Sequence, residues 1–122
     1  NQYHLMAGSR DLYIDLLLFH RRLRSLVAIE LKIGEFEAEY AGKMQLYLTA
    51  LDEQVKLPDE NPSIGMIICK SKDKTYVEYA LKQTSAPIGV ATYQLRSTLP
   101  DNMKAMLPEP EEIAKRLRIF EQ

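Results

Sequence analysis

The stretch VAIELKIGEF, from Val27 to Phe36, decides the predicted fold because it combines the pattern of a buried strand with two charges. Its apolar residues are mostly β-branched or aliphatic, which is typical of a strand inside a sheet. Side chains two residues apart share one face of a strand, so Glu30 and Lys32 point the same way. A carboxylate and an ammonium group on an apolar strand need either a partner or a function.

A third charge occurs in the preceding apolar stretch, Asp11–His20, which also has the pattern of a strand. An unpaired carboxylate buried at Asp15 would destabilise the fold or take up a proton. If this strand pairs with the predicted strand Leu26–Ile33 through a hairpin, Asp15 lies near Glu30. Two carboxylates and the ammonium group of Lys32 then converge on one patch of the sheet.

The rest of the chain alternates between strand and helix patterns. The predicted strands are Gln2–Met6, Asp11–His20, Leu26–Ile33, Ile64–Lys70 and Ile88–Leu95, and the predicted helices are Glu37–Val55, Lys74–Gln83 and short helices within Leu99–Gln122. The first three strands should form an antiparallel meander, and the long helix should connect two parallel strands by a crossover. The predicted fold class is therefore α/β, a mixed sheet flanked by helices in the order β-β-β-α-β-α-β-α.

The longest predicted helix has one apolar stripe that should pack on the sheet. Its members recur at helical spacing: Tyr40, Met44, Tyr47, Leu48, Leu51 and Val55. The strand at Ile64–Lys70 is continuously apolar, which is the pattern of a strand covered on both faces. Cys69, the only cysteine of the chain, should therefore be a buried apolar residue rather than a nucleophile.

Length and composition bound the class of protein. The chain has 122 residues, enough for one domain spanning residues 1–122, with 46% hydrophobic and 27% charged residues and a net charge of −1. This charge does not by itself favour nucleic acid as a partner. No apolar run is long enough to cross a bilayer, and a single cysteine fits a reducing compartment, so we expect a cytoplasmic protein without a membrane partner.

The convergent charges predict a metal site. Mg²⁺ prefers oxygen ligands and usually binds one or two carboxylates together with waters and substrate phosphate. Asp15 and Glu30 would supply the carboxylates, and the backbone carbonyl of Leu31 could supply a further oxygen. Lys32 would orient an attacking water or stabilise negative charge that develops on a phosphate. These parts suffice for metal-assisted hydrolysis of a phosphodiester bond.

Several stretches resemble the YhcG-type nucleases of the PD-(D/E)xK superfamily: QYHL at 2–5, YIDLL at 13–17, IELKIGEF at 29–36, EYAGKMQLYL at 39–48, NPSIGMIICKSKDKT at 61–75 and PIGVATYQL at 87–95. In this resemblance Asp15 is the first acid, and Glu30, Leu31 and Lys32 form the (D/E)xK motif. The resemblance extends from Asn1 to about Pro110. It implies a restriction-endonuclease-like fold and a hydrolase that cleaves DNA with Mg²⁺ or Mn²⁺.

The resemblance also implies features of the chain outside this motif. Members of the group carry a helical, DNA-binding-like region upstream, and the superfamily core opens with a helix, so we expect residues 1–122 to be the C-terminal part of a longer protein. Lacking that helix, the fragment should expose an apolar sheet face and self-associate as a homo-oligomer. Relatives of the RecB type place a tyrosine four residues after a helix glutamine. Gln45 is therefore a candidate site residue, although Thr49 occupies the tyrosine position.

Two interpretations stay open for the basic turn and for the Glu30–Lys32 pair. Arg21, Arg22 and Arg24 lie in the turn between two predicted strands and could contact DNA phosphates, or they could form a solvated hairpin tip. The Glu30–Lys32 pair could likewise be a structural ion pair that only stabilises the hairpin. A catalytically silent nuclease-fold domain that binds DNA or a partner protein is the alternative to a nuclease.

Overall fold

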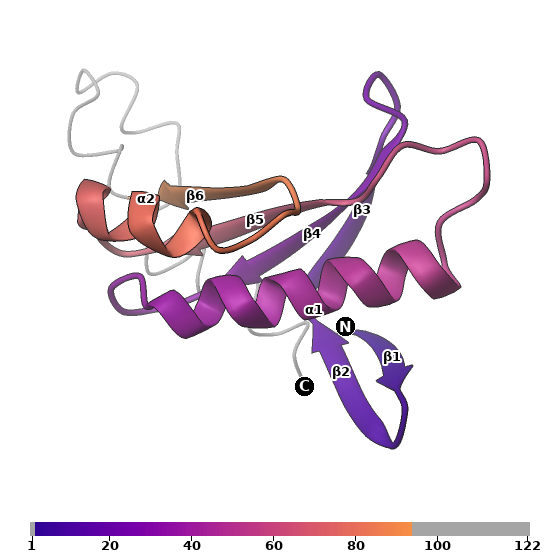
Figure 1. Ribbon diagram of the computed structural model, residues 1–122, viewed down its shortest axis with the longest axis horizontal. Coiled ribbons are helices and arrows are strands. Elements are labelled where there is room, and N and C mark those ends of the chain that lie inside the picture. The colour runs from indigo at the N-terminus through magenta and orange to yellow at the C-terminus, as the bar shows by residue number, and fades with distance from the viewer. Residues whose placement is uncertain (1, 94–122) are drawn as a thin grey trace, which may run out of the picture.

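The computed structural model describes residues 2–93, which form a four-stranded mixed sheet, a separate β-hairpin and two helices. The elements are β1 (Tyr3–Ala7), β2 (Arg10–Ile14), β3 (Leu16–His20), β4 (Ser25–Leu31), α1 (Ala38–Gln54), β5 (Ile64–Cys69), α2 (Lys74–Leu81) and β6 (Ile88–Thr92). Figure 1 shows α1 lying along one face of the four-stranded sheet, with the β1–β2 hairpin beside it. Within the described residues, neither helix combines the length and apolarity that a membrane span requires.

The four-stranded sheet has the order β3-β4-β5-β6. β3 and β4 are antiparallel, with Leu16 opposite Ile29 and His20 opposite Ser25. β4 runs parallel to β5, and β5 runs parallel to β6, so α1 connects two adjacent parallel strands as predicted. The α/β fold class with a mixed sheet and flanking helices is thereby confirmed. The predicted helices within Leu99–Gln122 and the end of the predicted last strand lie outside the described residues.

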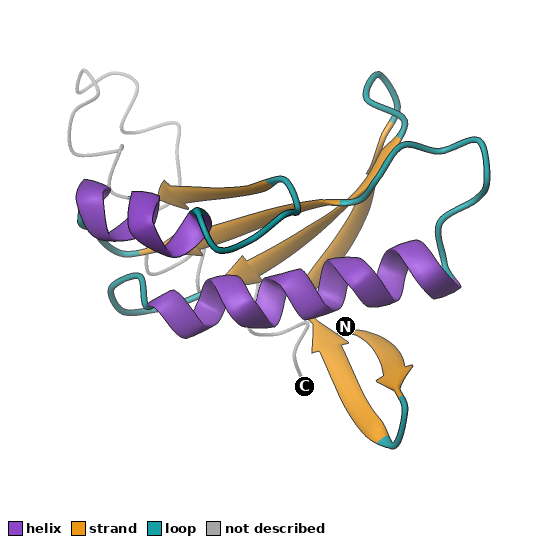
Figure 2. Ribbon diagram, viewed as in Figure 1, coloured by secondary structure: helices purple, strands orange, loops and turns teal. Residues whose placement is uncertain are grey.

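The predicted antiparallel meander is wrong, because Asp11–His20 is not one strand. The chain leaves the ladder at Asp15 and divides into β2, which pairs with β1, and β3, which pairs with β4. At the break, the backbone N–H of Asp15 donates to the Glu30 carboxylate, Oε1 at 3.1 Å, instead of to a backbone carbonyl. Figure 2 shows the result as two separate groups of strands. This hydrogen bond between the Asp15 N–H and the Glu30 side chain lies where the two-stranded β1–β2 sheet ends and the four-stranded sheet begins.

The core lies between α1 and the sheet. The residues of the predicted stripe at its centre, Met44, Tyr47, Leu48 and Leu51, are all buried, whereas Tyr40 and Val55 at its ends are partly exposed. Their partners on β5 include Ile67 and Cys69, which are fully buried, so the predicted burial of the cysteine is confirmed. Helical periodicity thus identified the packing face of α1 correctly.

The β1–β2 hairpin joins this core through one of its two faces. Leu5, Leu12 and Ile14 are buried in the same cluster as the α1 stripe. Because successive side chains of a strand alternate between faces, the other face of the hairpin points away from the core. This packing holds the hairpin in place beside α1.

The helix approaches β5 most closely at Gly65. A Cβ atom at this position would lie 2.5 Å from Cγ and 2.8 Å from Sδ of Met44. By contrast, a Cβ atom at Gly42, an exposed position within α1, would meet nothing within 4 Å. The absence of a side chain at Gly65 therefore sets the spacing between the helix and the sheet.

We expect Gly65→Ala to lower the free energy of unfolding by about 1–3 kcal/mol, since the added methyl group overpacks the helix–sheet contact. Gly42→Ala is the matched control and should raise it by about 0.5–1 kcal/mol, because alanine has the higher helix propensity. Urea unfolding monitored by circular dichroism measures both changes. Equal effects of the two substitutions would contradict this account of the contact.

Candidate active site

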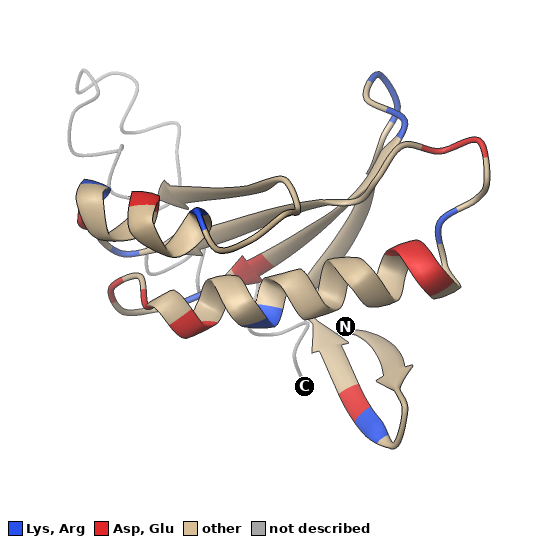
Figure 3. Ribbon diagram, in the orientation of Figure 1, with Lys and Arg blue, Asp and Glu red and all other residues tan. Residues whose placement is uncertain are grey.

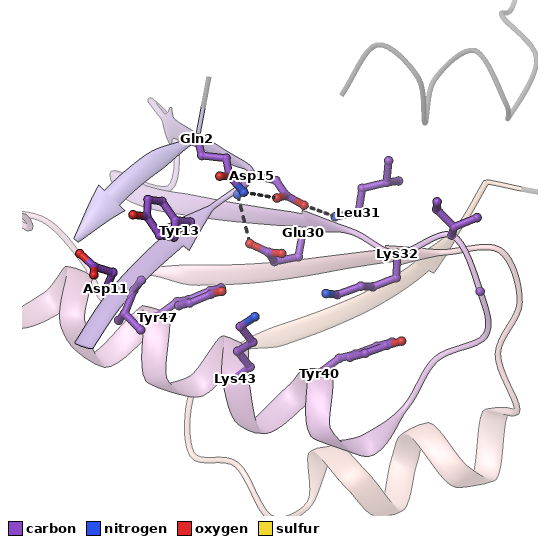
Figure 4. Close-up of a pocket in the computed structure, with 13 residues that line it drawn as sticks. Gln2, Asp11, Tyr13, Asp15, Glu30, Leu31, Lys32, Tyr40, Lys43 and Tyr47 are labelled. Atoms are coloured by element: carbon purple, nitrogen blue, oxygen red, sulfur yellow. Dashed lines mark hydrogen bonds between the residues drawn. The ribbon is translucent and has the colours of Figure 1, made fainter. Parts of the chain in front are cut away.

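The break in the chain brings two acids together near the end of β4. Asp15 lies between β2 and β3, and Glu30 is the penultimate residue of β4. The two residues are only 6% and 7% exposed. Figure 4 shows both carboxylates among the residues that line one pocket. The structure therefore brings together the two acids that the sequence analysis singled out.

Backbone amides hold these two carboxylates in place. The N–H of Asp15 donates to Oε1 of Glu30 at 3.1 Å, and the N–H of Leu31 donates to Oδ2 of Asp15 at 2.9 Å. Gln2 adds a longer contact from its Nε2 to Oδ1 of Asp15, at 3.4 Å. Each carboxylate is thus oriented by the main chain of the strand segment that carries the other. Because a carboxylate offers about four lone-pair sites, both acids retain acceptor capacity beyond these bonds.

The pair is electrostatically strained. Burial, followed by repulsion from the Asp15 carboxylate, raises the pKa of Glu30 from 4.5 to about 7, while Lys32 and the Asp15 N–H act in the opposite direction. A substantial part of Glu30 therefore carries a proton at neutral pH. A cation that enters the site would relieve the repulsion and favour release of that proton.

Two lysines reach the same pocket from different elements. Lys32 directly follows β4, and its Nζ lies 4.8 Å from the centroid of the Tyr40 ring. Lys43 comes from α1, and its Nζ lies 5.8 Å from the centroid of the Tyr47 ring. Figure 4 shows both amino groups directed into the space next to Glu30. Each ring attracts its ammonium group through a cation–π contact and so limits where the amine points.

The pocket has a volume of about 560 Å³, within the size range of small-molecule sites. The hairpin, the end of β4 and α1 contribute its walls. Its lining includes four of the predicted residues, Asp15, Glu30, Leu31 and Lys32, together with Gln2, Asp11, Tyr13, Tyr40, Lys43 and Tyr47. A polar cavity lined by both carboxylates and ammonium groups can bind a metal ion and a phosphate at the same time.

Sequence reasoning missed Lys43 and the polar role of Tyr47. Burial, with smaller contributions from Glu30 and Asp15, raises the pKa of Tyr47 above its ordinary value, so its hydroxyl stays protonated beside the acids. Lys43 precedes Tyr47 by four residues, a spacing that places both side chains on one face of a helix. This spacing is the signal in the sequence that could have placed both side chains in the pocket. Tyr47 also belongs to the apolar stripe of the helix, which accounts for it as a core residue.

The structure does not bring Gln45 into this pocket. Its Oε1 accepts a hydrogen bond from the Ala86 N–H at 3.1 Å, and its Nε2 contacts Oγ1 of Thr49 at 3.4 Å. Gln45 lines a separate cavity of about 540 Å³. The reason is helical geometry, since two residues along a helix turn a side chain through about 200°, away from the face that carries Lys43.

The basic turn also lies apart from the pocket. Arg24 forms an ion pair with Asp59, with Nη2 and Oδ2 at 2.8 Å. Arg24 lies six positions before Glu30, so the two are up to about 20 Å apart along β4. Figure 3 shows the basic tip of the β3–β4 hairpin at the end of β4 opposite to its acidic end. Arg21 and Arg22 share this tip, so any contact with nucleic acid there would be remote from the acids.

The chemistry of the donor set fits a hard divalent cation. Among residues 2–93 there is no group of three or more His, Cys, Asp or Glu side chains that could hold a metal ion. A site for Mg²⁺ does not need one, because this ion usually binds one or two carboxylates and takes its remaining ligands from water and substrate phosphate. Asp15 and Glu30 provide two such carboxylates, and their mutual repulsion is a reason for a cation to bind.

Comparison with known proteins gives two matches. The model of the YhcG PDDEXK nuclease domain family matches residues 1–108. The protein named "Putative nuclease YhcG" from Escherichia coli (strain K12) is 42% identical over 91 residues, which is 75% of this chain and 24% of that protein. The chain therefore spans about a quarter of the length of this relative. No solved structure matches significantly.

The raised pKa of Glu30 predicts an unusual dependence of stability on pH. The folded state holds the Glu30 proton more tightly than the unfolded state, so this residue favours folding below pH 4.5 and loses that contribution as the pH rises to about 7. The lost contribution corresponds to roughly 3 kcal/mol, since one pKa unit is about 1.4 kcal/mol.

The measurement is the free energy of unfolding at pH 5 and pH 8, without divalent metal, for the parent chain and for Glu30→Gln. The parent should lose stability across this interval relative to the variant, because glutamine does not titrate. If the free energy of unfolding of both proteins changes equally with pH, burial does not raise the pKa of Glu30.

Proposed function

The chain belongs to the YhcG PDDEXK nuclease domain family, and we propose that it hydrolyses phosphodiester bonds of DNA with Mg²⁺ or Mn²⁺. The observation that carries this proposal is the buried Asp15–Glu30 pair, which lines a pocket together with Lys32. A protein that needed only a stable fold would gain by replacing these acids with apolar residues. A nuclease site that binds a metal ion requires such a pair of acids.

Asp15 and Glu30 would hold the cation, with the backbone carbonyl of Leu31 as a further oxygen ligand. When bound, the cation would polarise a phosphate oxygen and lower the pKa of a bound water, which supplies the nucleophile for hydrolysis. The role of the chain is to fix the two carboxylates before substrate arrives. The Asp15 and Leu31 amides do this, since their hydrogen bonds leave each acid little freedom to rotate.

Lys32 would stabilise the negative charge that develops on the phosphate. Its ammonium group lies over the Tyr40 ring and is directed into the space next to Glu30. A preorganised cation acts strongly here because the partly enclosed pocket screens it less than bulk water would. Lys43 faces the same space from α1 and would add a second positive charge for the phosphate. The proposal assigns no role to Gln45, which lines a different cavity.

Metal binding should stabilise the fold. We expect millimolar Mg²⁺ or Mn²⁺ to raise the melting temperature by several degrees, because a ligand that binds only the folded state shifts the unfolding equilibrium. Asp15→Asn and Glu30→Gln should each abolish this shift. Asp59→Asn, which removes an exposed acid from the loop between α1 and β5 where it pairs with Arg24, is the control and should retain it. An identical shift in all four proteins would place the bound metal elsewhere.

Substitution of Lys32 should lower the rate of cleavage much more than the affinity for DNA. We expect Lys32→Met to lower the rate of metal-dependent DNA cleavage by about 100-fold or more, the usual cost of losing one preorganised charge in a transition state. Binding of DNA should change far less. Lys82→Met is the matched control, because Lys82 also lies over a tyrosine ring, at 5.8 Å, but outside the pocket.

The cleavage assay uses single-stranded, double-stranded and branched DNA, and RNA, with Asp15→Asn as the inactive reference. Equal activity in Lys32→Met and the parent would remove the proposed role of this lysine. Binding of DNA by the parent without cleavage of any substrate would favour the alternative of a catalytically silent domain.

A further inference from the structure

One face of the β1–β2 hairpin leads directly to the catalytic acids. Pairing of the two strands places Tyr13 opposite His4 and Asp11 opposite Met6. The alternate residues on the opposite face, Leu5, Leu12 and Ile14, are buried in the core. Asp15 follows two residues after Tyr13, at the bend where β2 ends; it lines the same pocket as Tyr13, and its carboxylate contacts Gln2. The outward face of the hairpin is therefore an extension of the acidic site.

Tyr13 presents an exposed aromatic ring on this face. The residue is 46% exposed and lines the pocket that contains Asp15 and Glu30. Its ring stacks on the His4 ring with a centroid separation of 4.9 Å and an interplanar angle of 21°. His4 is in turn held by Asp11, with Nε2 and Oδ1 at 2.6 Å. The stack covers one face of the tyrosine ring, and the exposure of the residue lets the ring contact a ligand as well.

We propose that this face of the hairpin is a base-stacking platform on which Tyr13 binds an unpaired nucleobase of the substrate strand, next to the phosphate at the catalytic acids. The inference rests on the proposed nuclease function and specifies its substrate class as single-stranded or locally unpaired nucleic acid. Tyr13 and Asp15 are two residues apart in the chain, so their Cα atoms lie at most about 7 Å apart, a separation comparable to the length of one nucleotide. A base on Tyr13 therefore belongs to a nucleotide adjacent to the scissile phosphate.

Base pairing would prevent this contact. Bases inside a duplex stack on their neighbours and offer only their edges in the grooves, so their ring faces are not accessible to a protein side chain. An unpaired base offers its ring face, and stacking on an aromatic side chain contributes about 1–3 kcal/mol with little sequence preference. A rigid, supported tyrosine beside the acids thus selects unpaired strands.

The charges of the pocket agree with a substrate strand that places a base on Tyr13 and a phosphate near the two acids. Figure 4 shows Tyr13 on one side of Glu30 and Lys32 on the other. The lysine therefore faces the phosphate while the base turns toward the hairpin. Asp11 also lines the pocket and would repel phosphate, but its carboxylate is engaged by His4. The hairpin side accordingly suits an uncharged base better than the sugar–phosphate backbone.

Equilibrium binding tests this inference without relying on cleavage. The 122-residue chain is titrated with fluorescently labelled single-stranded and blunt duplex oligonucleotides in EDTA, and anisotropy gives the affinities. We expect Tyr13→Ala to weaken single-strand binding about 5–150-fold, the range that corresponds to loss of one stacked base. Tyr13→Phe should retain binding within about twofold, because phenylalanine keeps the ring. Duplex affinity should be the same in all variants.

The matched control is Tyr79→Ala, which removes an exposed tyrosine, 64% exposed, from α2 outside the pocket. Its single-strand affinity should equal that of the parent. Circular dichroism melting establishes that each variant is folded. The inference is overturned if the parent does not bind single strands measurably, if Tyr13→Ala and Tyr79→Ala lose equal affinity, or if Tyr13→Ala weakens duplex binding as much as single-strand binding.

A parallel cleavage assay with Mg²⁺ keeps the two proposals distinguishable. Cleavage by the parent with no effect of Tyr13→Ala on single-strand affinity would reject the platform and leave the nuclease intact. Tyr13-dependent binding of single strands with no cleavage of any nucleic acid would reject the nuclease and leave the platform. Cleavage of single-stranded DNA that falls with Tyr13→Ala while duplex cleavage does not would support both.

Discussion

The structure depends on a reciprocal pair of hydrogen bonds between two neighbouring segments. The Asp15 amide binds the Glu30 carboxylate, and the Leu31 amide binds the Asp15 carboxylate. These bonds replace backbone pairing at one point of the sheet, so β2 ends there and β3 begins. The hairpin formed by β1 and β2 is consequently free to leave the four-stranded sheet and pack beside α1. The same two bonds create the site, since they bury both acids and define their orientation.

This arrangement costs stability. Burial and mutual repulsion raise the pKa of Glu30, which means that the folded chain prefers one of the two acids to be neutral. The nearby ammonium group of Lys32 offsets part of the repulsion, and a divalent cation would offset more. Strain of this kind is common where a protein is organised for binding or catalysis rather than for maximum stability. Membership of a nuclease family and the electrostatics of the pocket therefore point in the same direction.

The residues that line the pocket come from two kinds of structural element. Asp15, Glu30 and the two lysines come from the strand junction, the end of β4 and α1, whereas Tyr13 and Asp11 come from the hairpin. Core elements suit the chemical step, because their side chains are held by packing. A hairpin that packs through one face can present different side chains on the other without disturbing the core. The tyrosine platform is thus a feature through which the substrate can be chosen independently of the chemistry.

The sequence by itself determined the local features. Period-two alternation placed Glu30 and Lys32 on one face, helical periodicity identified the buried stripe around Met44 and Leu51, and the apolar run of β5 predicted a buried Cys69. Only the tertiary structure decided which polar residues meet. The break at Asp15 arises from a contact between residues fifteen positions apart, which no local pattern encodes. The same holds for α1: whether Lys43 or Gln45 faces the acids depends on how the helix is rotated against the sheet, because side chains two residues apart point in nearly opposite directions.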